Sequence, residues 1–335
     1  MNIAIIRRAD LGGIDGVNRF IFTLADGLRR LNNKVMVFGH HMTGNPSELF
    51  GVNIETRVIG ENGGGYIKYM WDWYVRGTKL LKEFEPEILI VNGVVPLRLK
   101  AFKIAVNHGN AIFELRESRL KRFITKRLYN MYDRVIHVSS KVANEMSQIG
   151  IKCDEVIPPP ILLENYSSNP EREAIILHVG TAPRKKPEVS IRAVEMLRNI
   201  GFNVKLILIG HYAGEVKDWL IIKSNCPDSE LRKLYSKALV LMHPSMWEGL
   251  PYAVLEAQAS GTPVIAGPGV PEEALVEGRT GFKIRSFDPK EYAEKLRVMV
   301  EDKSLWSYMS REARKYAEKF DHVKISMRYL KLYHG

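Results

Sequence analysis

Cysteines and long apolar runs are scarce in this sequence. Its 335 residues include two cysteines, Cys153 and Cys226, which form neither a disulfide framework nor a zinc-ligand spacing and fit a reducing cytosol. No segment approaches the ~20 apolar residues that span a bilayer. The start, MNIAIIRRAD, lacks the apolar core of a signal peptide. We therefore predict a cytoplasmic location, with peripheral attachment to the inner face of the membrane as the alternative.

Acidic residues are also in deficit. The chain has 49 Lys and Arg residues against 38 Asp and Glu residues, a formal charge of +11. Such a charge favours anionic partners, which include nucleic acids, acidic lipids and phosphorylated small molecules. Because no recognised nucleic-acid-binding module accompanies the charge, we expect no nucleic-acid partner.

Short apolar runs alternate with amphipathic helical stretches along most of the chain. Continuous apolar runs are typical of strands buried on both faces of a parallel sheet. The runs that predict strands are 2–6, 34–38, 87–91, 103–107, 134–138, 174–180, 204–210, 238–242 and 262–266. The rhythm occurs twice, so we predict an α/β protein with two Rossmann-like, doubly wound parallel-sheet domains.

The stretch IPPPILLENYSSNPERE (157–173) separates the two halves. It is rich in Pro, Ser and Asn and has no apolar period, which is typical of an interdomain linker. We expect an N-terminal domain at 1–160 and a C-terminal domain at 161–318. The last segment, 319–335, is expected to be a helix that packs back on the N-terminal domain, after a helix break around Phe320–His322.

Two features of the first half follow predicted strands. ADLGGIDGVNRF (9–20) places Gly12, Gly13 and Gly16 between a strand and a helix, where glycines let a ligand approach the backbone. This spacing differs from the dinucleotide-binding fingerprint, which argues against a dehydrogenase; a tight turn is the alternative explanation. His108 in VNHGN (106–110) lies at a strand end, where ligands of open sheets bind.

A basic turn follows the first strand of the second half. GTAPRKKPEVSIRAVEML (180–197) places Arg184, Lys185 and Lys186 between a strand and a helix. Cations at this position can neutralise a diphosphate, including the charge that grows as a diphosphate leaves. A solvated basic turn is the alternative.

Two glutamates flank a turn in SMWEGLPYAVLEAQASGTPV (245–264). Glu248 precedes the turn, while Glu256 lies inside the predicted helix, which we expect to begin near Gly249–Leu250 with Pro251 in its first turn. If the whole stretch were helical, the glutamates would be roughly 12 Å apart. That exceeds the ~5–5.5 Å between the carboxylates of a retaining hydrolase. The spacing favours binding both ends of an extended ligand, with phosphates held between them.

SMWEGLPYAVLEAQASGTPVIA resembles the E-x7-E signature of family 4 glycosyltransferases, retaining enzymes of the GT-B fold. LGGIDGVNRF, VNHG, RVIHVSSKVANEM, DSELRKLYSKALVLMHPS and GVPEEALVEGRTGFKI resemble other family motifs in the same order. The resemblance implies two domains that face a cleft. It also implies transfer from a nucleotide-diphosphate sugar without a metal or other cofactor at the active site.

The resemblance also assigns roles to individual residues. By motif match, Glu256 binds the ribose, Glu248 holds the donor sugar's hydroxyls, and Lys186 binds the diphosphate. Gly13 faces the same phosphates, and His108 lies near the reacting sugar. Where the family often has an arginine after the glycine, this chain has a threonine.

We name Glu248, Lys186 and His108 as catalytic residues. The donor-binding candidates are Gly12, Gly13, Arg184, Gly249, Leu250, Pro251 and Glu256. Thr181 occupies the position of the family's arginine, for which Arg184 is the candidate replacement.

These features predict a glycosyltransferase (hexosyltransferase type, EC 2.4) acting on a glycan or lipid-linked acceptor in cell-surface polysaccharide or glycolipid synthesis. The alternatives are a non-catalytic nucleotide-sugar-binding subunit and a GT-B nucleotide-sugar epimerase. RESRLKRFITKRLYNMYDR (116–134) adds a basic helix, and 66–81 adds an aromatic cluster. For these two segments we favour a solvated helix face with core aromatics. Contact with an anionic membrane is the alternative.

Overall fold

A computed structural model describes residues 1–13, 15–61, 63, 66–109, 112–169 and 171–334. The chain divides into two compact units. Unit 1 comprises Met1–Ile161 and Phe320–Gly335, and unit 2 comprises Leu162–Lys319. The expected boundaries at 160 and 318 each lie one residue from these limits.

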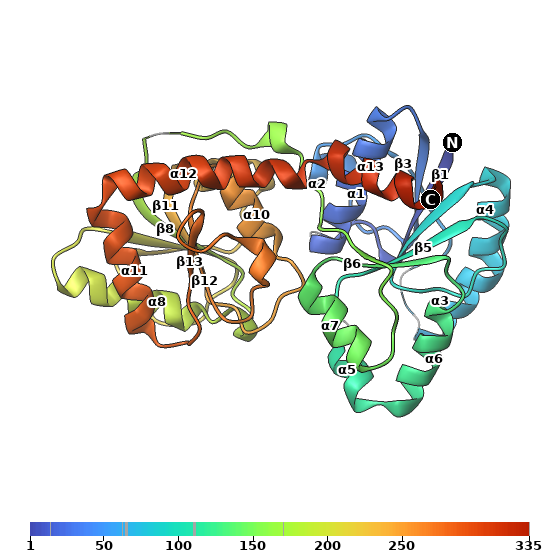
Figure 1. Ribbon diagram of the computed structural model, residues 1–335, viewed down its shortest axis with the longest axis horizontal. Coiled ribbons are helices and arrows are strands. Elements are labelled where there is room, and N and C mark those ends of the chain that lie inside the picture. The colour runs from blue at the N-terminus through green and yellow to red at the C-terminus, as the bar shows by residue number, and fades with distance from the viewer. Residues whose placement is uncertain (14, 62, 64–65, 110–111, 170, 335) are drawn as a thin grey trace. The chain divides into compact units, whose positions relative to one another are not determined.

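Unit 1 is built on a parallel sheet (Figure 1). The strand order of this sheet is β3-β2-β1-β4-β5-β6-β7. Its strands are β1 (Asn2–Asp10), β2 (Lys34–His41), β3 (Glu55–Val58), β4 (Ile88–Asn92), β5 (Phe102–Asn107), β6 (Arg134–His137) and β7 (Glu155–Val156). Side chains of β1 from Ile3 to Ile6 are fully buried, as the continuous apolar run predicts.

The helices of unit 1 lie between its strands along the chain, except for one that ends the chain. They are α1 (Gly16–Arg30), α2 (Pro46–Phe50), α3 (Tyr66–Asp72), α4 (Thr78–Phe84), α5 (Ile112–Glu117), α6 (Arg119–Tyr129), α7 (Ser140–Gln148) and α13 (His322–His334). A π-helical segment, Trp73–Gly77, joins α3 to α4. The apolar stripe of α1 is buried, with Phe20, Ile21 and Leu24 fully enclosed, because this face packs in the core of the unit.

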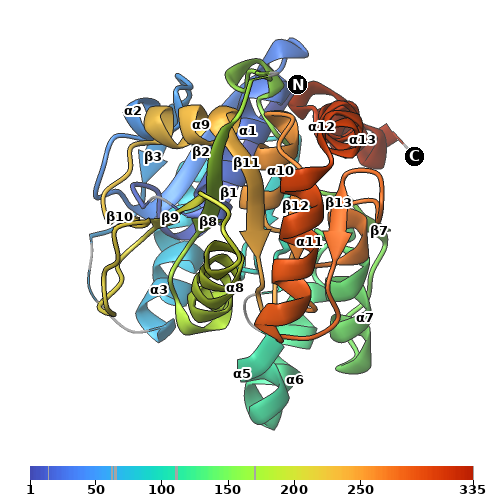
Figure 2. The same ribbon diagram turned by 90° about the vertical axis from the view of Figure 1, so that its left-hand side faces the viewer.

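Unit 2 repeats the architecture with a parallel sheet of order β10-β9-β8-β11-β12-β13 (Figure 2). Its strands are β8 (Glu173–Val179), β9 (Lys205–Ile209), β10 (Leu220–Lys223), β11 (Ala238–His243), β12 (Val264–Ala266) and β13 (Gly281–Lys283). Its helices are α8 (Pro187–Asn199), α9 (Asp228–Lys237), α10 (Tyr252–Ala259), α11 (Pro289–Glu301) and α12 (Lys303–Ala317). The predicted pair of doubly wound α/β domains is therefore confirmed.

All nine predicted strands are present, but the structure adds β3, β7, β10 and β13. These four strands have two to four residues each, too few for an apolar run to stand out. All four also lie at sheet edges, where one side of the strand is left unpaired. The apolar pattern of the sequence therefore predicts short edge strands less well than long central ones.

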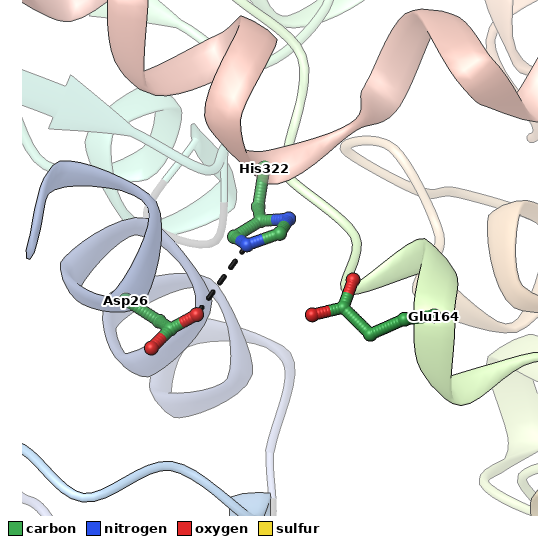
Figure 3. Close-up of side chains that lie close together, drawn as sticks. All are labelled: Asp26, Glu164 and His322. Carbon is green, nitrogen blue, oxygen red and sulfur yellow. Dashed lines mark ion pairs between the residues drawn. The ribbon is translucent and has the colours of Figure 1, made fainter. Parts of the chain in front are cut away.

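The C-terminal helix belongs to unit 1. The chain leaves α12 at Ala317, passes through a 3₁₀ turn and forms α13, so the expected break is confirmed. The Nε2 atom of His322 lies 3.3 Å from the Oδ2 atom of Asp26 on α1, and both side chains are buried (Figure 3). A Cβ on Gly27 would lie 2.3 Å from the Ser326 hydroxyl, so glycine permits the close approach of α1 and α13.

Each sheet has a switch point where the strand order reverses direction. It lies between β1 and β4 in unit 1, and between β8 and β11 in unit 2. Open α/β sheets bind ligands in the crevice outside the carboxyl ends of the strands at such points. The motifs singled out in the sequence follow β1 and β5 in unit 1 and β8 and β11 in unit 2.

Candidate active site

In unit 2, the loops that follow β8 and β11 meet at the switch point. The Met246 backbone N–H donates to the Arg184 carbonyl at 2.8 Å. The Arg184 side chain in turn donates to the Trp247 carbonyl at 3.0 Å. The basic turn and the glutamate loop therefore form one structure, although more than 50 residues separate them in sequence.

Glu248 is the centre of this structure. Its side chain is 8% exposed, and its Oε1 atom lies close to three nitrogen donors. Arg184 donates at 3.0 Å, Lys185 at 2.5 Å and His243 at 3.1 Å. A carboxylate held in this way keeps its orientation, because each donor restrains the same oxygen.

The charges of this cluster influence one another's protonation. Burial by itself raises the pKa of Glu248. The hydrogen bond from His243 and the positive charges of Lys185 and Arg184 outweigh burial and hold that pKa well below its usual value. Burial, together with the charge of Lys185, lowers the pKa of His243. Burial also lowers the pKa of Lys185, against the opposing effect of Glu248. At neutral pH the site therefore holds a carboxylate beside a neutral imidazole.

Lys186 turns away from this cluster. Its backbone is left-handed, with φ +56°, and Pro187 follows it as the first residue of α8. The Lys186 Nζ atom lies 3.3 Å from Glu188 and 6.0 Å from the ring centre of Phe287. The two consecutive lysines therefore contact different carboxylates, Glu248 for Lys185 and Glu188 for Lys186.

Glu256 is almost fully buried on α10, with 3% of the residue exposed. The helix begins at Tyr252, with Pro251 as the residue before it, so the expected start near Gly249–Leu250 is wrong by two residues. The reason is the Pro251 backbone, which stays extended with ψ 123°. The estimate of roughly 12 Å between the two glutamates assumed one continuous helix. It does not apply, since only Tyr252–Glu256 of that span is helical.

A glycine-containing loop after β12 supports the glutamate loop. The Glu248 backbone N–H donates to the Gly269 carbonyl at 3.0 Å. A Cβ on Gly269 would lie 2.1 Å from the Met246 backbone, and one on Gly267 would lie 2.7 Å from Pro244. Both positions need glycine because two backbone segments are in direct contact.

The glycine loop of unit 1 is held by carboxylates. Asp10 accepts hydrogen bonds from the backbone N–H groups of Gly12 and Thr43 and from the Thr43 hydroxyl. A Cβ on Gly12 would lie 2.0 Å from Gly44, so packing against that neighbouring loop accounts for Gly12. Gly13 has no such contact, since the nearest atoms to a Cβ there lie 3.6 Å away or more. Packing therefore does not require glycine at position 13, and the Gly13 carbonyl accepts from the Asn18 Nδ2 atom at 2.8 Å.

His108 follows β5 and contacts the end of β4. Its Nε2 atom lies 2.9 Å from the Asn92 Oδ1 atom, while the Asn92 Nδ2 atom donates to the Ile6 carbonyl at 3.1 Å. Because the amide nitrogen is used there, Oδ1 faces the ring, and His108 carries its proton on Nε2. Burial, and then the charge of Arg7, lower the pKa of His108 to about 4. The imidazole is therefore neutral, with Nδ1 as a hydrogen-bond acceptor.

The structure brings some of the predicted residues together and leaves others apart. Glu248 and Arg184 are in contact, with Gly249–Pro251 next to them in sequence. Lys186 pairs with Glu188 instead. Gly12, Gly13 and His108 belong to unit 1.

Sequence reasoning missed one partner of Glu248 and one of His108, and it named Lys185 in the basic turn without selecting it as a site residue. His243 and Lys185 contact the carboxylate, and Asn92 contacts the imidazole. His243 and Asn92 are the last residues of β11 and β4, and this position was the available signal for them. Among the described residues of unit 2, no three His, Cys, Asp or Glu side chains come close enough to share a metal ion.

Both halves of the chain match glycosyltransferase families. Residues 14–165 match the model described as Glycosyltransferase Family 4, and residues 164–316 match Glycosyl transferases group 1. With its two Rossmann-like units, the chain has the architecture of the GT-B fold. The two models together cover most of the chain, which therefore belongs to the GT-B glycosyltransferases.

Curated relatives are similar over part of their length. The D-inositol 3-phosphate glycosyltransferase of Streptomyces avermitilis is 31% identical over 174 residues, which is 45% of this chain and 37% of that protein. The corresponding Corynebacterium glutamicum protein (strain R) is 30% identical over 184 residues, covering 49% and 44%. The matched segments thus span less than half of either relative.

Solved structures show the same fold over the whole chain. Sucrose-phosphate synthase from Thermosynechococcus elongatus has a TM-score of 0.81 at 16% identity, covering 100% of this chain and 98% of that one. Anabaena Alr3699/HepE, solved in complex with UDP and glucose, has a TM-score of 0.79 at 16% identity, covering 99% and 98%. At these identities the similarity establishes the fold.

Proposed function

We propose that the chain transfers a sugar, with retention of configuration, from a nucleotide-diphosphate sugar to a glycan or lipid-linked acceptor. The observation that carries this proposal is the convergence of Arg184, Lys185 and Glu248 at the switch point of unit 2. Two cations beside an oriented carboxylate suit a ligand with a diphosphate at one end and hydroxyls at the other. HepE, a structural neighbour, was solved with UDP-glucose, which supports such a donor.

In this proposal, Glu256 binds the ribose and Glu248 binds hydroxyls of the donor sugar. Lys185 and Arg184 stabilise the diphosphate as it leaves, and Lys186 remains the lysine that the motif match selects. Gly13 in unit 1 faces the same phosphates, as the motif match assigns. Each role places a charged or backbone group where the substrate carries the complementary atoms.

The reaction breaks the bond between the anomeric carbon and the diphosphate oxygen, and forms a bond from that carbon to the acceptor oxygen. The departing diphosphate takes the proton of the acceptor hydroxyl on the same face of the sugar. The protein then contributes positioning and charge stabilisation rather than a nucleophile. The cations Arg184 and Lys185 supply the counter-charge, so activity should persist in the presence of EDTA.

The donor assignment is tested by thermal unfolding of the full chain with UDP, GDP and ADP and their sugar conjugates. A ligand at a hundred times its Kd adds about 2.7 kcal/mol to the free energy of unfolding. We expect stabilisation by one nucleotide series, its loss in Glu256→Gln, and its retention in the control Glu294→Gln, since Glu294 is exposed on α11. The absence of stabilisation with all three series would refute a nucleotide-diphosphate donor.

A membrane partner is proposed from helices α5 and α6. Of the residues of α6, only Tyr129 is buried, which agrees with a solvated helix. The apolar side chains on α5 and α6 that reach solvent are Phe113, Leu120, Phe123 and Ile124. They alternate with the cations Arg116, Arg119, Lys121, Arg122, Lys126 and Arg127. Exposed apolar groups flanked by cations are the combination that binds an anionic membrane surface. No helix formed by the described residues is long and apolar enough to cross a bilayer.

Co-sedimentation with vesicles tests this surface. We expect binding to phosphatidylglycerol vesicles, weaker binding to phosphatidylcholine vesicles, and a decrease as salt rises. Leu120→Ser combined with Phe123→Ser should abolish binding. Ile200→Ser removes an exposed apolar side chain from unit 2 and should leave binding unchanged. Equal binding of all three proteins would contradict the proposal.

A further inference from the structure

Unit 1 contains a cavity of ≈ 490 Å³ at the switch point of its sheet. It is lined by residues at the carboxyl ends of β1, β4 and β5 and by residues of α5 and α6. The volume lies within the range of small-molecule sites. The side chains that carry the argument are Arg7, Arg8, Asn107, His108, Glu114 and Lys121.

Two buried donors at this cavity are unsatisfied. Asn107 is 5% exposed, and its Oδ1 atom accepts the Gly109 N–H at 2.7 Å, which orients the amide. Its Nδ2 atom has no hydrogen-bond partner among the described residues. The Nε atom of Arg7 is also buried and has no hydrogen-bond partner among the described residues. The two terminal nitrogens of Arg7 donate to Asp15 at 3.0 and 2.7 Å. Buried donors are nearly always paired, so these two indicate a ligand that supplies oxygen atoms.

The charge of the lining has the sign that such a ligand requires. Three cations, Arg7, Arg8 and Lys121, face the cavity against a single carboxylate, Glu114. Glu114 pairs with Lys121 at 3.1 Å, but both side chains are largely exposed, so an incoming anion can displace this contact. His108 offers the complementary group, because its neutral ring leaves Nδ1 free to accept from a hydroxyl. The cavity therefore combines donors for an anion with an acceptor for a hydroxyl.

We propose that this cavity binds the acceptor substrate through a phosphoryl group, with an acceptor hydroxyl near His108. The inference rests on the proposed function, because it specifies the chemical class of the acceptor. Arginine pairs with phosphate oxygens through parallel hydrogen bonds, and the Asn107 amide adds a neutral donor. The phosphoryl group can belong to a soluble sugar or polyol phosphate or to a lipid phosphate, and both present the same oxygens.

The test measures phosphate binding to the full chain by calorimetry. The nucleoside diphosphate that stabilises the protein is kept saturating, so that the donor site is occupied. The probes are inorganic phosphate, glucose 6-phosphate, glucose, and vesicles containing polyprenyl phosphate. We expect phosphorylated probes to bind at least tenfold more tightly than glucose. Preference for glucose 6-phosphate would assign a soluble acceptor, and preference for the vesicles a lipid-linked one.

Variants locate the binding. Asn107→Asp keeps the oxygen that accepts from Gly109 but replaces the donor by an anionic oxygen, and Arg7→Gln removes a cation. Both should weaken binding of phosphorylated probes at least tenfold. Lys82→Gln removes an exposed cation from α4 that does not line the cavity and should change binding less than twofold. The comparison is valid where the unfolding midpoint of the variant equals that of the wild type. If Arg7→Gln fails to fold, Arg7→Lys takes its place.

Two results would overturn the inference. One is that no phosphorylated probe binds more tightly than glucose, and the other is that Asn107→Asp and Arg7→Gln bind as the wild type does. If the nucleoside diphosphate still stabilises the chain, the proposed function stands and only the acceptor class is wrong. If no nucleoside diphosphate binds, the proposed function itself fails.

Discussion

At the scale of single residues, the two neighbouring lysines after β8 have different surroundings. The Lys185 side chain is 15% exposed and lies 2.5 Å from Glu248. The Lys186 side chain is 29% exposed and lies 3.3 Å from Glu188. A lysine enclosed beside a carboxylate at the switch point is better placed to meet a leaving diphosphate than one that pairs at the start of a helix.

We therefore expect Lys185→Ala to lower kcat by about 100-fold or more, which is the scale of removing one group that stabilises developing charge. The motif match predicts a comparable loss for Lys186→Ala. Steady-state kinetics of both variants decides between the lysines. A normal kcat in Lys185→Ala, with a large loss in Lys186→Ala, would show that the contact with Glu248 is purely structural.

Asn92 is a positioning residue for His108. Replacing its amide by a carboxylate in Asn92→Asp places a negative charge 2.9 Å from Nε2. A nearby negative charge favours the imidazolium form, so the pKa of His108 should rise from about 4 toward or above its usual value. NMR titration of His108 checks this directly.

The wild-type pH–rate profile should show no inflection from His108 above pH ~5, whereas the Asn92→Asp profile should gain one near neutrality. Asn92→Gln, which keeps an amide, serves as the control for charge. An unshifted titration in Asn92→Asp would contradict the assigned contact.

At the scale of secondary-structure elements, Arg172 joins the ends of two helices of unit 2. It donates to the carbonyls of Tyr235 and Ser236 at the end of α9, at 2.9 and 2.6 Å. It also donates to the carbonyls of Ser260 and Gly261 after α10, at 2.7 and 3.1 Å. Carbonyls at helix ends carry partial negative charge, so a cation there stabilises both helices. Burial lowers the pKa of Arg172 to about 10, which leaves it charged at neutral pH.

Arg172→Ala should lower the free energy of unfolding of unit 2 by about 3 kcal/mol, since hydrogen bonds to a charged group contribute roughly 1.5–3 kcal/mol each and do not add fully. Denaturant unfolding measures the loss. Hydrogen exchange should increase most at the ends of α9 and α10. Arg192→Ala, on the exposed face of α8, is the matched control. If Arg172→Ala lowers the free energy of unfolding by less than Arg192→Ala does, the Arg172 hydrogen bonds do not stabilise unit 2.

At the scale of the whole molecule, lowered histidine pKa values occur in both units. His108 and His137 belong to unit 1, and His178 and His243 belong to unit 2. Burial is the first cause for each of them, and it lowers the pKa of His178 to about 3. A group whose pKa is lowered on folding binds fewer protons in the folded state than in the unfolded state.

Stability should therefore fall as pH decreases from about 6.5 toward 4, where the unfolded histidines become protonated and the folded ones do not. The free energy of unfolding between pH 7.5 and 4.5 checks this. His178→Asn, which removes one such group, should reduce the slope. The carboxylates with lowered pKa values, such as Glu248, lose their contribution only below about pH 4.5. A free energy of unfolding that does not change between pH 7.5 and 4.5 would contradict the conclusion that these histidines are buried and neutral.

The sequence predicted features that depend on consecutive residues, and it missed features that depend on residues far apart in the chain. The run 103–107 predicted β5 (Phe102–Asn107) because burial on both faces of a strand is written into consecutive residues. The two-residue strand β7 carries too few residues for any period. In the same way, Glu248 stood out beside its turn, whereas its partners Lys185 and His243 come from positions that no local pattern connects to it.

The sequence by itself determined the class of the molecule. Apolar runs, helix stripes and six ordered motifs predicted two Rossmann-like units and the glycosyltransferase family, since each signal depends on neighbouring residues. Only the tertiary structure decided which lysine contacts Glu248, which contacts place α13 against α1, and which buried donors line the cavity of unit 1. These features depend on side chains far apart in the chain, and packing, rather than local periodicity, sets which of them meet.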